Sequence, residues 1–281
     1  MFHPTLRTLG WTGCLALGAV AAGFAAPRIL DDRAAVGPTL LAAESVNGAV
    51  LTTIVTAVLA LVGGLVMARI INGAAGLFGS GLVVACVAWR CADSSAWALG
   101  GGTALGLAVE CGLAALLTGG LAAAVLRARP LSDVEPTEDG RRPAILASPE
   151  AAKMLAACMV AIPVAWILAR SMETGQTIFA ATLAGVVAGL AARIASPHVQ
   201  PVAAFVGVPL AGAVGAVAVS LMAMEGRTPE AALRAAELPG LLSVMPLDWA
   251  AGTLLGVPMG LGWARTFLHH EDTPAAVAAG S

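Results

Sequence analysis

One acidic side chain, Glu110, stands inside a long apolar stretch of this sequence and is the residue best placed to do chemistry. A carboxylate in a membrane segment costs a few kcal/mol or takes up a proton and becomes neutral. Gly102, Gly106 and Glu110 are spaced four apart, and Thr103 stands seven before Glu110. On one continuous helix these four residues share a face, and small residues on such a face favour close contact with another helix. The pattern predicts that Glu110 points into a helix bundle.

Two roles are open for Glu110. It is a proton or cation site in a cavity, or it is a protonated carboxyl that holds neighbouring helices together by a hydrogen bond. The segment Gly252–Val257, GTLLGV, is similar to Gly102–Leu107, GTALGL, so Thr253 joins Thr103 as a candidate ion or substrate ligand. The same spacing gives three expected helix-packing glycines, with the last in the place of Glu110: Gly252, Gly256 and Gly260.

A repeated apolar segment indicates how these positions are organised. Thr53–Ile70, TIVTAVLALVGGLVMARI, returns at Thr177–Ile194 as TIFAATLAGVVAGLAARI, with nine of eighteen residues identical. Together with the second match, this repeat predicts two similar halves of four membrane helices each. Because each half holds an even number of spans, the two halves form a parallel duplication.

Composition supports an all-α, polytopic membrane bundle. The chain is 58% hydrophobic and only 11% charged, with a mean hydropathy of +0.87. We expect two membrane halves at 1–126 and 151–268, a hydrophilic cytoplasmic linker at 127–150 and a polar tail at 269–281. Residues 1–26 are either the first span or a cleaved signal. About eight spans are predicted: 10–26, 49–71, 74–89, 96–126, 151–171 with a kink at Pro163, 177–195, 199–222 and 247–267.

Basic residues predict the orientation. Nine Lys and Arg fall on the side of the two termini and six on the other side, which favours cytoplasmic termini in a bacterial inner membrane. Arg69 and Arg193 close the repeated spans, and we expect them to be topology anchors at the headgroups rather than substrate contacts. Asp248, beside Pro246, is interpreted as a helix cap rather than a catalytic group.

Several function classes are excluded or open. The net charge of −2 gives no field for nucleic acid, and the sequence carries no recognisable catalytic motif, cofactor motif or metal-ligand spacing. We expect the lipid bilayer as a partner and no cofactor or metal. The first hypothesis is a small permease, and the alternative is a non-catalytic subunit or scaffold that packs against other membrane subunits or itself. An intramembrane enzyme remains a third reading.

Overall fold

The computed structural model describes residues 4–29, 45–131, 148–197 and 200–268, and within them every regular element is a helix. The expected tail and most of the expected linker lie outside the described residues. The helices are α1 (Pro4–Ile29), α2 (Val46–Ile70), α3 (Gly73–Cys91), α4 (Ser94–Leu99), α5 (Ala104–Ala128), α6 (Pro149–Ala157), α7 (Ala161–Leu168), α8 (Thr174–Ala195), α9 (Val202–Ala223), α10 (Pro229–Arg234) and α11 (Pro246–Leu268), with 3₁₀ turns η1 (Cys158–Val160) and η2 (Gly240–Ser243). The all-helical prediction is confirmed.

Seven helical segments of the described chain are long and apolar enough to cross a membrane, counting α6 to α7 as one. The expected eighth span, α11, has 23 residues but is not among these seven. Its position explains why it needs less hydrophobicity, since α11 packs against α8, α3, α5 and α9 and is mostly buried. A helix surrounded by protein does not have to be apolar on every face, as a lipid-facing helix does.

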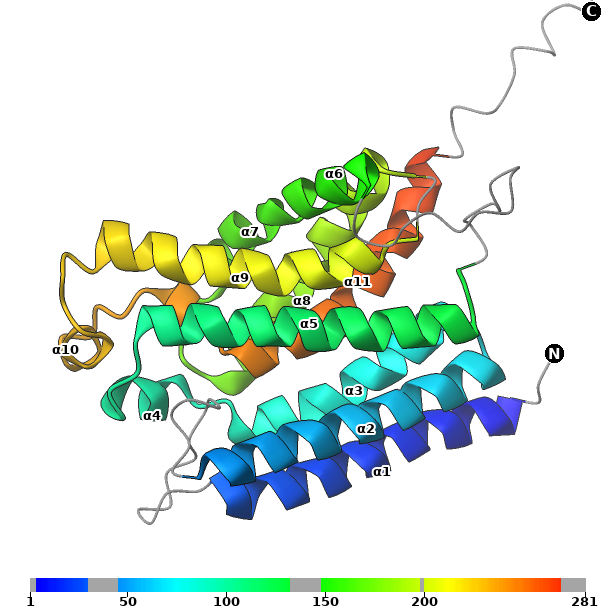
Figure 1. Cartoon of the computed structure of the whole chain (residues 1–281), viewed down its shortest axis with the longest axis horizontal. Coiled ribbons are helices and arrows are strands. Elements are labelled where there is room, and N and C mark those ends of the chain that lie inside the picture. The colour runs from blue at the N-terminus through cyan, green and yellow to red at the C-terminus, as the bar shows by residue number, and fades with distance from the viewer. Residues whose placement is uncertain (1–3, 30–44, 132–147, 198–199, 269–281) are drawn as a thin grey trace, which may run out of the picture.

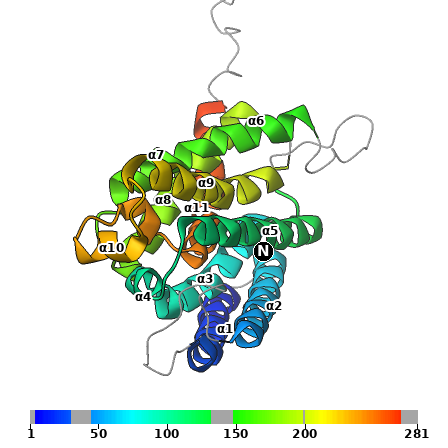
Figure 2. The same ribbon diagram turned by 60° about the vertical axis from the view of Figure 1, so that its left-hand side comes forward.

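The bundle has two groups of helices, and one helix of each group also packs on the other group. Helices α1, α2 and α3 pack together, and α8 packs on α6 and α7 (Figure 1). Helix α5 follows the first group in the chain but packs mainly on α9. Helix α11 packs on α8 of the second group and also on α3 of the first. Figure 2 shows α11 among α3, α5, α8 and α9 near the middle of the bundle. The beginning of α1 and the end of α11 lie at the same end, on the right in Figure 1.

The predicted single span 96–126 is wrong, because the chain breaks between α4 and α5. Gly101 has a φ of 80°, a left-handed conformation that glycine adopts without strain and that ends a helix. Thr103 then begins α5 as its N-cap, with its hydroxyl accepting a hydrogen bond from the Gly106 amide at 3.0 Å. The run of glycines therefore makes a turn instead of continuing a tilted helix.

Prolines shape two of the other spans. The predicted kink at Pro163 is confirmed, since the 3₁₀ turn Cys158–Val160 separates α6 from α7 just before it. Pro209 lies inside α9 and has no amide hydrogen for the Phe205 carbonyl one turn earlier. That carbonyl instead accepts a 2.6 Å hydrogen bond from the Thr118 hydroxyl of α5. The proline break in α9 is thus bonded to the neighbouring helix.

Candidate functional site

Glu110 lies in the second turn of α5 and is only 3% exposed. The apolar residues that precede and follow it make α5 a membrane-length helix, and the helix packs on α9, α11 and α2. Its side chain therefore faces the interior of the bundle, as the sequence pattern predicts. The burial agrees with both roles that the sequence leaves open.

Asp248 is a second buried carboxylate, which the sequence analysis interprets only as a cap. It stands in the first turn of α11, and its Oδ2 accepts a 3.1 Å hydrogen bond from the Met245 amide. The capping role is therefore present, but the residue is also fully buried, at 0% exposed. The Thr177 hydroxyl lies beside the carboxylate but donates to the Thr174 carbonyl at 3.0 Å, and Asp248 Oδ1 has no hydrogen-bond partner among the described residues.

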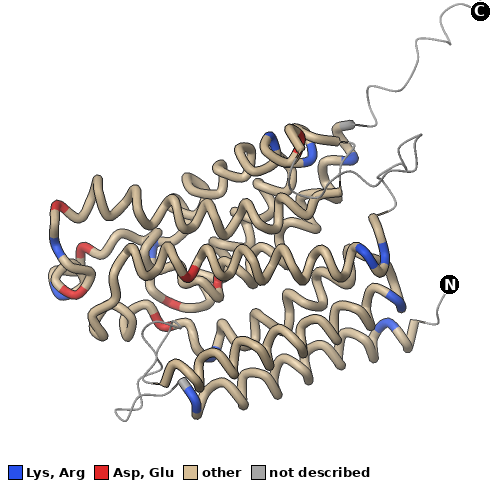
Figure 3. Tube along the Cα trace, in the orientation of Figure 1, with Lys and Arg blue, Asp and Glu red and all other residues tan. Residues whose placement is uncertain are grey.

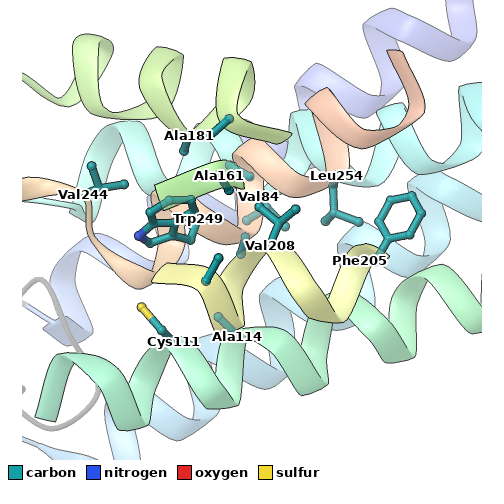
Figure 4. Close-up of a cluster of buried hydrophobic side chains, with 14 of the residues drawn as sticks. Val84, Cys111, Ala114, Ala161, Ala181, Phe205, Val208, Val244, Trp249 and Leu254 are labelled. Carbon is teal, nitrogen blue, oxygen red and sulfur yellow. The ribbon is translucent and has the colours of Figure 1, made fainter. Parts of the chain in front are cut away.

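The two carboxylates belong to one region of the interior. Cys111, the neighbour of Glu110 in sequence, is 0% exposed on α5, and α5 packs on α11, the helix that carries Asp248. Figure 4 shows the Cys111 sulfur on α5 directed toward the cluster that contains Trp249, the residue after Asp248. Helices α5 and α11 both begin at this end of the bundle, so the second turn of α5 and the first turn of α11 each place an acidic side chain in the buried interior near this end.

The remaining predicted ligands do not form a continuous face with Glu110. Gly102 and Thr103 lie in the turn before α5, so only Gly106 of the expected set shares the helix with Glu110. Gly102 packs tightly on Trp97, where an added Cβ would lie 2.3 Å from the indole nitrogen. Thr253 is fully buried in α11, and its hydroxyl donates to the Trp249 carbonyl of its own helix at 2.6 Å. The two similar segments thus differ at their beginning, because Gly102–Leu107 starts in a turn and enters α5 at Ala104, whereas Gly252–Val257 is helical throughout.

The three glycines of α11 lie where this helix meets α8. An added Cβ would lie 2.4 Å from the carbonyl carbon of Ala181 at Gly252, 2.1 Å from the Thr182 oxygen at Gly256 and 2.0 Å from the Val186 oxygen at Gly260. The backbones of the two helices therefore touch, and no side chain fits between them. This contact fixes the first turn of α11, and with it Asp248, against Thr177 of α8.

The two expected arginine anchors differ. Arg69 is exposed at the end of α2, in keeping with a headgroup contact, but Arg193 is 2% exposed on α8. The expectation that Arg193 reaches the headgroups is therefore wrong. Its helix is covered there by α6, and one turn later Ser196 donates to Glu150 Oε2 of α6 at 2.8 Å. The sequence shows the shared Ala-Arg-Ile ending but not which of the two copies another helix covers.

No group of three or more His, Cys, Asp or Glu side chains in the described ranges is arranged to hold a metal ion. The length and apolar composition of seven helical segments in the described chain define an integral, multi-pass helical membrane protein. Comparison with protein-family models, with curated proteins and with solved structures finds no match for this chain. The functional argument therefore rests on the site itself.

Proposed function

We propose that the chain is a small permease in which Glu110 and Asp248 form a proton or cation site between two halves of the bundle. The observation that carries the proposal is the burial of two carboxylates, at 3% and 0% exposed, on helices from opposite halves. A carboxylate inside a membrane helix is costly. Such residues almost always face the interior of the bundle instead of the lipid, and they mark proton relays and ion pathways.

The proposed halves are residues 1–126 and 151–268, joined by 127–150, with eight crossings in total. Two observations support a parallel duplication. The repeated segments fall on α2 and α8, and both helices end at the end of the bundle where α1 begins and α11 ends. The fourth long helix of each half, α5 or α11, packs on the third long helix of the other half, α9 or α3. Transport by relative movement of two such halves places the binding site at their interface.

The chemistry of the site follows from its two carboxylates. When both are protonated, the site itself carries no net charge and the layer around Cys111 and Trp249 can stay closed. Loss of a proton creates a negative charge that a cation can neutralise, or that favours a conformation open to water. The Met245 amide and the positive end of the helix dipole both face the Asp248 carboxylate in the first turn of α11, while its Oδ1 has no hydrogen-bond partner among the described residues. We propose Asp248 and Glu110 as the two proton-exchanging groups of the site.

Charge distribution supports an orientation with both termini in the cytoplasm of a bacterial cell, in the inner membrane. Among the described residues, seven basic side chains lie at the end of the termini: Arg7, Arg69, Arg127, Arg129, Lys153, Arg193 and Arg265. Five lie at the opposite end: Arg28, Arg90, Arg170, Arg227 and Arg234. Figure 3 shows that acidic residues at the ends gather mainly with the second group. An excess of Lys and Arg in short loops is typical of the cytoplasmic side.

A pH jump across proteoliposomes tests the proposal without knowledge of the substrate. Protein reconstituted on a solid-supported membrane is switched from neutral to mildly acidic buffer, and the displaced charge is recorded. A proton site gives a transient current in the wild type, which Glu110→Gln and Asp248→Asn each reduce. Glu150→Gln is the matched control, because Glu150 lies on α6 outside the proposed site. A scaffold subunit gives no current, and a current unchanged in both site variants would refute the proposed site.

A further inference from the structure

A cavity of about 370 Å³ opens at the end of the bundle opposite Glu110 and Asp248. It lies where three segments meet: the start of α3, the end of α5 and the second half of α11. Its size is within the range of pockets that hold small ligands. The cavity is separate from the proposed proton site, and its role does not depend on the permease proposal.

The charged lining of the cavity is basic. Arg129, which follows α5, and Arg265, in the last turn of α11, both line it, and the described lining residues include no carboxylate. The start of α3 adds Asn72 and the positive end of a helix dipole. Two guanidinium groups from different helices can bind one tetrahedral anion, because each presents paired N–H donors in a fixed plane.

One wall of the cavity is tightly packed, and the glycine on the opposite wall faces open space. An added Cβ at Gly73 would lie 2.2 Å from the Arg129 carbonyl oxygen, so the start of α3 is docked directly on the end of α5. An added Cβ at Gly262, across the cavity on α11, has no atom within 4 Å. A larger side chain at Gly262 therefore enters the cavity without disturbing the packing.

The surroundings point to the depth of the lipid headgroups. Trp263 is next to Gly262 and is 57% exposed, and Met259 one turn earlier is 42% exposed. Exposed tryptophan is typical of the membrane interface, and exposed apolar residues next to the cavity can accept acyl chains. The cavity itself has apolar side chains, including Leu77 and Leu261, beside its two arginines. A ligand with a phosphate group and an apolar or neutral body suits this lining.

We propose that this cavity binds a phosphate group, carried by an anionic phospholipid or by a soluble phosphoester. Binding ties the end of α5 to α11 across the boundary between the two halves. The lipid source places the phosphate between the arginines and the acyl chains along Met259 and Trp263. The soluble source fills the same space from the aqueous side.

Native mass spectrometry of the full chain in mild detergent tests this with two probes, phosphatidylglycerol and glycerol 3-phosphate. We expect the wild type to retain one of them. Gly262→Leu fills the cavity, and the double variant Arg129→Gln/Arg265→Gln removes the charges. Each is expected to weaken binding about tenfold or more, the first because it occupies the space of the ligand and the second because it removes charge-assisted hydrogen bonds. Retention of the lipid alone identifies a headgroup site, and retention of glycerol 3-phosphate identifies a soluble ligand.

Matched controls separate the cavity from general charge and size effects. Gly120→Leu adds the same side chain on the exposed face of α5, where an added Cβ also has no atom within 4 Å. Arg69→Gln/Arg127→Gln removes two exposed charges from the same end of the bundle. Both controls are expected to bind as the wild type does. The proposal is overturned if the wild type binds neither probe, or if Gly262→Leu binds a probe as tightly as Gly120→Leu does. The comparison of the two leucine variants remains valid even where the double arginine variant fails to fold.

Discussion

Replacing Thr118 by valine removes the hydroxyl that bonds α5 to α9 while it keeps the shape of the side chain. The Thr118 hydroxyl donates to the Phe205 carbonyl at 2.6 Å, and that carbonyl has no helical partner because Pro209 lacks an amide hydrogen. A buried carbonyl left without a donor costs about 1–3 kcal/mol. Hydrogen bonds between membrane helices contribute about 0.6 kcal/mol on average and at most about 1.7. We therefore expect Thr118→Val to lower the free energy of unfolding by about 1.5 kcal/mol.

A double-mutant cycle with Pro209→Ala isolates the cause. Alanine restores an amide hydrogen at this position, which can donate to the Phe205 carbonyl within α9. Thr118→Val should then cost about 0.5 kcal/mol or less, which gives a coupling energy of about 1 kcal/mol between the two positions. The free energy of unfolding is measured by titration with sodium dodecyl sulfate in mixed micelles.

Thr53→Val is the matched control for this cycle. The Thr53 hydroxyl donates at 2.9 Å only to the Ala49 carbonyl of its own helix, so its loss should cost little in either background. If Thr118→Val costs the same in the wild type and in the Pro209→Ala background, the carbonyl at the proline break does not depend on Thr118. The explanation of the α5–α9 contact would then be wrong.

Three further predictions use the same unfolding assay. Gly256→Ala should destabilise by about 1–3 kcal/mol because its Cβ meets backbone of α8, while Gly262→Ala on the same helix should be neutral or slightly stabilising; equal effects would contradict the described helix contact. Arg193→Gln should lower the free energy of unfolding by at least about 1 kcal/mol more than Arg69→Gln, since only Arg193 is buried. A larger effect of Arg69→Gln would contradict the burial of Arg193. Asp248→Ala should be about 1 kcal/mol less stable than Asp248→Asn, which keeps an oxygen to accept the capping amide; equal stability would exclude the cap.

The sequence predicts the helices well because each apolar run is long enough to cross a bilayer and is bounded by polar residues or prolines. The kink before Pro163 follows from the chemistry of proline alone. The break at Gly101 is missed because glycine in an apolar run has two uses, close packing in a helix and a left-handed turn. Only the conformation at Gly101, with the cap at Thr103, distinguishes them.

The candidate site is predicted only in part for a related reason. Glu110 stands out because no charged residue is near it in the sequence. Asp248 does not stand out, since the first turn of a helix is an ordinary place for an acidic cap, and nothing local tells that four other helices bury α11. Likewise, the shared ending of α2 and α8 does not show that Arg193 is buried while Arg69 is exposed. Burial by distant segments of the chain decides each of these cases.

Accessibility of Cys111 tests most directly whether the buried carboxylates are reached from water during a transport cycle. Cys111 is 0% exposed, follows Glu110 in α5, and lies on a helix that packs on α11, which carries Asp248. The test uses a variant in which Cys111 is the one remaining cysteine and alanine replaces Cys14, Cys86, Cys91 and Cys158. This variant is reconstituted in liposomes and treated with a membrane-impermeant maleimide. The permease account predicts modification of Cys111 in the folded protein, at a rate that Glu110→Gln changes. Modification only after unfolding would contradict the account and leave Glu110 and Asp248 as structural groups.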